Sequence, residues 1–153
     1  MNLFGVMDVS ASALQAERVR AEVTASNMAN AETTRTADGG PYRRQQVVFQ
    51  TAGQDGTFGA AFMSHLGMHG GSVSSNATGG VEVAGVQDDA KAPIMRFDPG
   101  HPDADANGYV AYPDIDPLTE MVELMSAQRS YGMNASAVQA EKSMITSSLD
   151  ILK

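Results

Sequence analysis

The chain has long segments free of glycine and proline at both ends and a glycine-rich segment between them. No Gly or Pro occurs from Val6 to Asn30, whereas residues 51–113 hold 11 of the 15 Gly. From Asp114 to Lys153 there is one Gly, Gly132, and one Pro, Pro117, placed where a helix would start. Because Gly and Pro disfavour helix interiors, we predict an α+β fold whose N- and C-terminal helices pack as a coiled-coil-like pair beside a small β-rich middle domain.

The predicted domains follow the same division. Residues 1–32 and 114–153 are expected to form the helical domain, and residues 33–113 the β-rich domain, with a flexible Gly-rich insertion at about 53–80. Seven of the nine aromatic residues lie between Tyr42 and Tyr112, so we expect the compact core in the middle. Strands are predicted at Tyr42–Gln50, Val81–Val86, Ile94–Phe97 and Tyr109–Tyr112.

Composition excludes several classes of function. The formal net charge is -8, which repels phosphate backbones and anionic lipids, so we expect no nucleic-acid partner. The absence of Cys excludes disulfides and cysteine-based zinc or nucleophile chemistry. The first residues lack a basic region and include Asp8 in their apolar part, and no stretch reaches transmembrane length. We therefore expect neither a cleaved signal peptide nor direct membrane insertion.

The N-terminal helical segment has two opposed apolar stripes. A helix that covers a single core needs only one stripe, so this pattern predicts a helix held between two neighbours. In the alternative interpretation, both neighbours belong to the helix's own domain. One stripe holds Met7, Ala11, Leu14, Ala21, Ala25 and Met28, and the other holds Val9, Ala16, Val19 and Val23.

The C-terminal segment has a helix start and a seven-residue repeat. Asp116 is expected as N-cap, Pro117 as the first helical residue and Glu120 in the first turn. The repeat predicts a coiled-coil seam, and a second stripe gives the helix more apolar surface than one partner covers. The seam holds Leu124, Tyr131, Val138, Ile145 and Leu152, with Ala127 or Gln128, Ala135, Lys142 and Leu149 between them. The second stripe holds Leu118, Met121, Val122, Met125, Met133 and Ala140.

One acidic segment has two interpretations. Asp103, Asp105, Asn107 and Gly108 match the first half of a calcium loop, and Asp114 falls at its twelfth position. Flanking prolines disfavour the helices that such a loop needs. We therefore favour a turn whose side chains bond nearby backbone N–H groups, and we expect no metal.

The remaining polar residues point to no reaction. His65 and His69 have helical spacing for a shared metal, but nearby glycines favour a solvated loop. The basic pair Arg43 and Arg44 is interpreted either as a dock for a neighbour's carboxylates or as a solvated strand edge. His101 is expected to be structural. The sequence contains no Ser/His/Asp arrangement and no phosphate-binding loop, so we expect no catalytic residue, no cofactor and no enzymatic activity.

Three segments together resemble the proximal-rod proteins of the bacterial flagellar basal body, of the FlgC type. The first, ASNMANAETT at Ala25–Thr34, is similar to the S-x-N-L-A-N-x-x-T signature of axial proteins, with Met28 in place of the usual Leu. Its two Asn suit a helix end, where Asn tolerates left-handed backbone and bonds free carbonyls. The others are TRTADGGPYRR at Thr34–Arg44 and FDPGHPDADANGYVAYP at Phe97–Pro113, followed by the helix with MVELMSAQRSYGMNA.

The resemblance implies a mechanical function. In this family both terminal helices pack together and against neighbouring subunits as the inner tube of a helical rod, outside which the middle domain lies. The rod transmits torque from the motor across the periplasm to the hook. Expected partners are copies of the chain, other proximal and distal rod proteins, the rod-to-membrane-ring adaptor, and the flagellar type III export apparatus in transit. Competing interpretations are another axial protein, a calcium-binding module and a soluble export adaptor or chaperone.

Two groups of residues are expected to carry this function. The predicted assembly interface consists of Leu14, Val19, Val23, Asn27, Asn30, Leu124, Tyr131, Val138, Ile145, Leu149 and Leu152. The predicted signature loops contain Arg43, Arg44, His101, Asp103, Asp105, Asn107 and Gly108.

Overall fold

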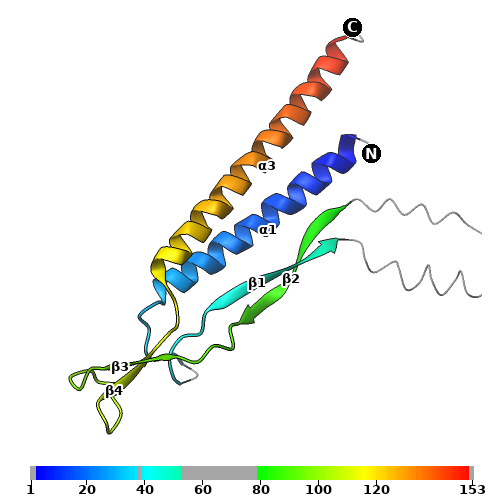
Figure 1. Cartoon of the computed structure of the whole chain (residues 1–153). Coiled ribbons are helices and arrows are strands. Elements are labelled where there is room, and N and C mark those ends of the chain that lie inside the picture. The colour runs from blue at the N-terminus through cyan, green and yellow to red at the C-terminus, as the bar shows by residue number, and fades with distance from the viewer. Residues whose placement is uncertain (1–2, 38, 53–78, 152–153) are drawn as a thin grey trace, which may run out of the picture.

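The structure is a computed structural model that describes residues 3–37, 39–52 and 79–151. Within these ranges it contains two long helices and two antiparallel two-stranded sheets (Figure 1). This arrangement confirms the predicted α+β fold with a pair of terminal helices. The elements are α1 (Leu3–Ala29), β1 (Gln45–Ala52), β2 (Gly80–Asp88), β3 (Ile94–Phe97), β4 (Tyr109–Tyr112) and α3 (Pro117–Ile151).

The two helices run antiparallel and place both chain termini at the same end of the molecule (Figure 1). At a rise of 1.5 Å per residue, the 27 residues of α1 span about 40 Å and the 35 residues of α3 about 52 Å. The α3 positions Glu120, Ala127 and Glu141 are buried, at a spacing that keeps them on one line facing α1. Leu124 and Val138, on the neighbouring line, are half-buried.

The predicted seam is correct in part of each line. In the first line Leu124, Val138 and Ile145 are half-buried as expected, but Tyr131 is exposed. In the second line Ala127 is buried and Ala135 half-buried as expected, whereas Lys142 and Leu149 are exposed. Apolar periodicity missed the buried Glu120 and Glu141 because both are polar.

The start of α3 is as predicted. Asp116 accepts hydrogen bonds from the hydroxyl of Thr119 at 2.7 Å and from the backbone N–H of Leu118 at 3.1 Å. These bonds lower the pKa of the Asp116 carboxyl, the Thr119 hydroxyl contributing most. Asp116 is thus the N-cap, and Pro117 follows as the first helical residue.

The β1–β2 hairpin lies along α1 on the side away from α3 (Figure 1). Val81 and Val83 are half-buried while Glu82 between them is exposed, so one face of β2 meets the helix. The Ser12 hydroxyl accepts the backbone N–H of Val81 at 3.1 Å. The approach is so close that a Cβ on Gly80 would come 2.9 Å from that oxygen. Within the chain, α1 therefore lies between α3 and a hairpin from the predicted β-rich domain.

The second sheet is a short ribbon at the far end from the chain termini (Figure 1). Its strands β3 and β4 match the predicted ranges, with Phe97 paired to Tyr109 and Ile94 to Tyr112. Val110 is fully buried on one face, whereas Met95 on the other face is exposed. The ribbon is therefore covered on one side only.

The expectation of a compact aromatic core in the middle is wrong. Phe49, Phe97 and Tyr109 expose 40%, 67% and 43% of their surface. A two-stranded sheet has no second layer to cover its outer face, so these rings stay at the surface. Among the described residues, the buried hydrophobic side chains are Ala16, Val110, Ile115 and Ala127.

Some sequence predictions lie outside the described residues, namely those for His65, His69, Leu152 and most of the 53–80 insertion. Of the two helices described, neither is both long enough and apolar enough to cross a bilayer.

Candidate functional site

A buried amide joins α1, β1 and α3 at one end of the helix pair. Asn27 is 1% exposed. Its Oδ1 accepts the backbone N–H of Gln45 at 2.9 Å, and its Nδ2 donates to the carbonyl of the same residue at 2.8 Å. Nδ2 also donates to Glu120 Oε2 at 3.1 Å, and the Tyr42 hydroxyl donates to Oδ1 at 3.2 Å. Both donors and both acceptor positions of the side chain are therefore used.

Arg44 completes this cluster. Its Nε donates to Glu120 Oε1 at 2.6 Å, and its Nη2 to Glu123 Oε1 at 3.1 Å. Burial would lower the pKa of the guanidinium, but the hydrogen bond to Glu120 and the charges of both carboxylates outweigh burial and raise it. Glu120 is 1% exposed, and the bonds from Arg44 and Asn27 compensate its buried charge.

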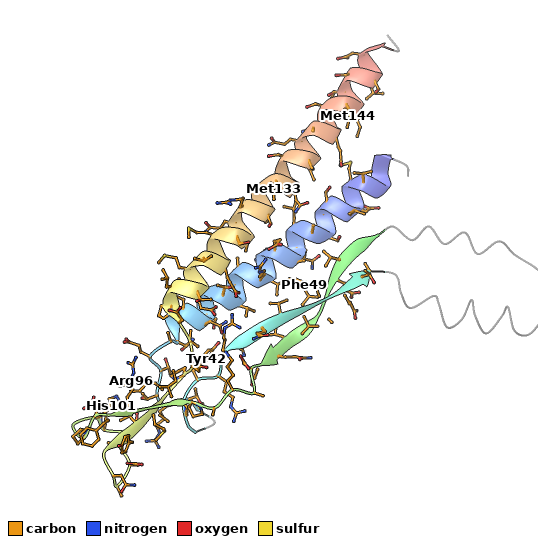
Figure 2. All side chains as sticks on the ribbon, viewed as in Figure 1. Tyr42, Phe49, Arg96, His101, Met133 and Met144 are labelled. Atoms are coloured by element: carbon orange, nitrogen blue, oxygen red, sulfur yellow. The ribbon has the colours of Figure 1, made fainter. Side chains whose placement is uncertain are left out.

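We call Asn27, Tyr42, Arg44, Gln45 and Glu120 the junction. Tyr42 lies where the chain enters β1, close to the end of α1 (Figure 2). The junction holds the first residue of β1 against both helices, which explains why β1 begins at Gln45 rather than at the predicted Tyr42. Of the predicted basic pair, Arg44 binds carboxylates of its own chain and Arg43 is exposed.

The outer side of α3 is apolar and uncovered. Leu118, Val122 and Met133 expose 69%, 55% and 62% of their surface. Met133 and Met144 are labelled along this helix in Figure 2. We define the outer stripe as the predicted second stripe, every member of which is exposed: Leu118, Met121, Val122, Met125, Met133 and Ala140. Exposed apolar patches of this kind mark interaction surfaces.

The acidic loop between β3 and β4 is held by its own backbone. Asp105 Oδ1 accepts the backbone N–H groups of Asn107 and Tyr109 at 2.8 and 2.9 Å. Gly108 has a φ of 79°, and a Cβ there would approach the Phe97 ring at 3.0 Å. This is the turn favoured over the calcium loop.

The first carboxylate of the proposed calcium loop is held by the segment that follows α1. Asp103 Oδ2 accepts the Thr34 hydroxyl at 2.8 Å, and its Oδ1 lies 3.6 Å from Arg35 Nη1. His101 Nδ1 accepts the backbone N–H of Asp103 at 3.1 Å, and its ring meets Tyr112 edge-on. Among the described residues, no three His or acidic side chains are grouped to hold a metal ion. The segments Thr34–Arg44 and Phe97–Pro113, which contain the signature loops, therefore contact each other through Asp103.

The residues predicted at the assembly interface fall into three places. Asn27 is in the junction, and Asn30 ends α1 by donating to the carbonyl of Ser26 at 2.9 Å. Asn30 thus has the predicted carbonyl-bonding role. Neither Asn uses a left-handed backbone, because no described non-Gly residue has a positive φ. The half-buried members are Leu14, Val19, Val23, Leu124, Val138 and Ile145, and the exposed members are Tyr131 and Leu149.

Comparison with known proteins identifies the family. Residues 7–35 match the family described as flagella basal body rod protein, and residues 106–151 match the flagellar basal body rod FlgEFG protein C-terminal family. Over all of both chains, the sequence is 42% identical to the flagellar basal-body rod protein FlgC of Bacillus subtilis. The chain belongs to the FlgC family of flagellar basal-body rod proteins.

Other FlgC proteins align over the same length. Identity is 40% to FlgC of Yersinia enterocolitica and 40% to FlgC of Salmonella typhimurium, in each case over 99% of this chain and 98% of the relative. The resemblance noted from sequence segments is therefore confirmed, and these relatives are structural rod proteins rather than enzymes.

Sequence reasoning missed three members of the junction. The sequence assigns Glu120 only to the first turn of α3, and it assigns Tyr42 and Gln45 only to a strand. A seven-residue spacing of Glu120, Asn134 and Glu141 on a helix with an apolar seam was the available signal. Polar residues at such positions are either paired or costly, so they point to a partner.

Proposed function

We propose that this FlgC-family chain is a structural subunit of the proximal rod. In this proposal it polymerises helically with copies of itself and with other proximal and distal rod proteins, and it contacts the rod-to-membrane-ring adaptor. The assembled rod transmits torque across the periplasm to the hook and is required for motility. The chain acts without catalysis and reaches the periplasm through the flagellar type III export apparatus without a cleaved signal peptide.

The observation that carries this proposal is the outer stripe. A single chain leaves it uncovered, although four of its six members are Met or Leu. Thioethers adapt to irregular partners, and burying such side chains gains about 25 cal/mol per Å² of apolar surface. Copies related by a non-closing operation bury these stripes in an open helix rather than a ring.

The proposed division of labour follows the predicted domains. Residues 1–32 and 114–153 would form the inner tube and residues 33–113 the outer part. The junction supports this division, because it fixes the entry of β1 to both helices through short, partly buried hydrogen bonds. Mechanical load applied to the outer part would pass into the helix pair at the junction.

The test is a deletion strain of the organism that encodes the chain. Detergent-extracted hook–basal bodies from wild-type cells are expected to contain the protein by mass spectrometry, and the deletion strain is expected to build neither rod nor hook. Normal basal bodies in the deletion strain would reject a structural role. A plasmid copy of the gene controls for effects on neighbouring genes.

A further inference from the structure

The outer edge of β1 borders an open groove. Among the described strands, β1 pairs only with β2. Its other edge faces a groove of about 330 Å³, whose walls include Arg20, Val23 and Thr24 of α1 and Glu123 of α3. β1 contains no charged residue and no Pro, the two features that commonly protect an edge strand from pairing with another strand. This edge is therefore suited to accept a further strand.

The bonds of Gln45 show where the backbone of β1 points. Both its N–H and its carbonyl bind the side chain of Asn27 instead of β2. Residues two apart on a strand direct their backbone groups to the same edge, and the extra residue at the register shift, Ala84, lies on β2. The N–H and carbonyl groups of Val47 and Phe49 therefore also point to the outer edge. Within the described part of the chain, no side chain binds these groups.

The β3–β4 ribbon, at the far end from the chain termini, has a free edge on β3 (Figure 1). The N–H of Asp98 donates to the carbonyl of Gly108, so every second residue of β3 counted from Asp98 bonds β4. The residues between them, Met95 and Phe97, direct their backbone groups away from β4. β3 thus presents an edge of the same kind as β1.

The other two outer edges are partly capped by groups of the chain itself. On β4, Asp105 accepts the N–H of Tyr109 through Oδ1 at 2.9 Å and donates its own N–H to the Tyr109 carbonyl at 2.8 Å. On β2, the Ser12 hydroxyl accepts the N–H of Val81 at 3.1 Å. The free positions of β1 and β3 have no such cap among the described residues.

The side chains at these free positions are apolar and complementary. Residues that exchange backbone bonds across antiparallel strands lie directly opposite each other, with their side chains on one face. Pairing of the two edges would therefore bring Val47 and Phe49, which lies beside α1 in Figure 2, next to Met95 and Phe97. Phe49, Met95 and Phe97 expose 40%, 53% and 67% of their surface. Aromatic and β-branched cross-strand pairs stabilise such a contact.

We propose that β3 of one copy adds to the free edge of β1 in the next copy and runs antiparallel to it. This inference rests on the proposed function, since it names two surfaces of the rod contact. The uncovered face of the ribbon then fills the groove beside α1, and neither strand brings a carboxylate to a contact between copies of charge -8. Because two different edges meet, one β1 and one β3 stay free at opposite ends and the contact repeats along a filament.

Proline substitutions test the pairing edges. Val47→Pro removes an N–H that would bond β3, and an edge strand tolerates Pro where its N–H faces outward. The matched control is Val86→Pro, which lies directly opposite on β2 and removes an N–H from the other edge. The Tm values of the two purified variants are expected to agree within about 2 °C. In the deletion strain, Val47→Pro is expected to give about tenfold fewer hook–basal bodies per cell than Val86→Pro, because each contact loses main-chain bonds.

Cysteine crosslinking tests the contact directly, because the chain has no Cys of its own. Gln50→Cys on β1 is combined with Ile94→Cys on β3, both at exposed positions, and the extracted rods are treated with a short bismaleimide. The control combines Ile94→Cys with Glu82→Cys, which lies opposite Gln50 on β2. Both combinations remove the same Gln50–Glu82 hydrogen bond. Covalently linked pairs of the chain are expected from the first combination and not from the second.

Equal numbers of basal bodies with the two proline variants would overturn the inference. Linked pairs that form equally in both cysteine combinations, or in neither, would do the same. If Val47→Pro unfolds at a much lower temperature than Val86→Pro, the crosslinking result decides. If the wild-type gene itself restores no rods, the proposed function fails, whereas normal rods without a link between Gln50→Cys and Ile94→Cys reject only this strand pairing.

Discussion

Asn27 binds the N–H and the carbonyl of Gln45 much as an adjacent strand would, while its amide also reaches Glu120. From the sequence alone, Asn27 is interpreted as a residue that ends the helix. Its actual partners lie 18 and 93 residues away. The residue types near Asn27 do not indicate partners so far away in the sequence, so the junction could not be predicted. The role of Asn30 could be predicted, because its partner Ser26 is only four residues away.

Replacing Asn27 tests the junction at the scale of one side chain. Asn27→Ala removes hydrogen bonds from Glu120 and from the Gln45 backbone at a buried position. We therefore expect the free energy of unfolding to fall by about 2–4 kcal/mol. The matched control is Asn134→Ala, whose amide donates only to the carbonyl of Ser130 in its own helix. Urea unfolding of both variants measures the difference, and equal losses would show that Asn27 is an ordinary helix residue.

Asp116 gives the chain a local dependence on acid. Its pKa is lowered below the ordinary 3.8 by the Thr119 hydroxyl and then by the Leu118 N–H. A depressed folded-state pKa means that the cap stabilises the fold above pH 3.8 and is lost as pH falls through the lower folded value. We therefore expect the Tm of wild type, measured relative to Asp116→Asn, to decrease as pH is lowered from neutral through that window. A Tm difference that is constant with pH would contradict the cap's charge dependence.

At the scale of elements, α1 and α3 differ in how much of their surface the chain covers. Among the described elements, α1 is packed on two sides, by α3 and by the β1–β2 hairpin, whereas α3 packs only on α1. Beyond that contact, α3 binds Arg44 through Glu120 and Glu123. Helix and strand positions followed well from Gly, Pro and apolar spacing, and β3, β4 and the start of α3 agree with prediction. The sequence did not indicate which element packs against each stripe, because a stripe of Ala and Val can pack against either a helix or a sheet.

A charge on the outer stripe separates folding from assembly. Met125→Glu places a carboxylate on a half-exposed position of α3, where helix propensity changes little. We expect its Tm to stay within about 2 °C of wild type, the size of a surface effect, while motility on soft agar is abolished. Gln87→Glu adds the same charge at an exposed position of β2, which does not contact α3, and is expected to swim. Normal swimming by Met125→Glu would show that the stripe is not buried in the rod.

For the whole molecule, the net charge of -8 opposes contact between copies. Raising salt from about 0.01 M to about 0.15 M shortens the screening length from about 30 Å to about 8 Å. We therefore expect the purified chain to associate at lower protein concentration in the higher salt, as measured by sedimentation velocity. Association that weakens with salt would instead indicate that exposed ion pairs dominate.

The two ends of the molecule are unlike each other, since both chain termini lie at one end and the β3–β4 ribbon at the other (Figure 1). A polymer in which every copy points the same way inherits this difference, so its two tips present different surfaces. Such a filament has a direction: the tip that offers ribbons and the tip that offers helix ends recognise different proteins. One chain fold is then enough to distinguish the base of a rod from its growing end.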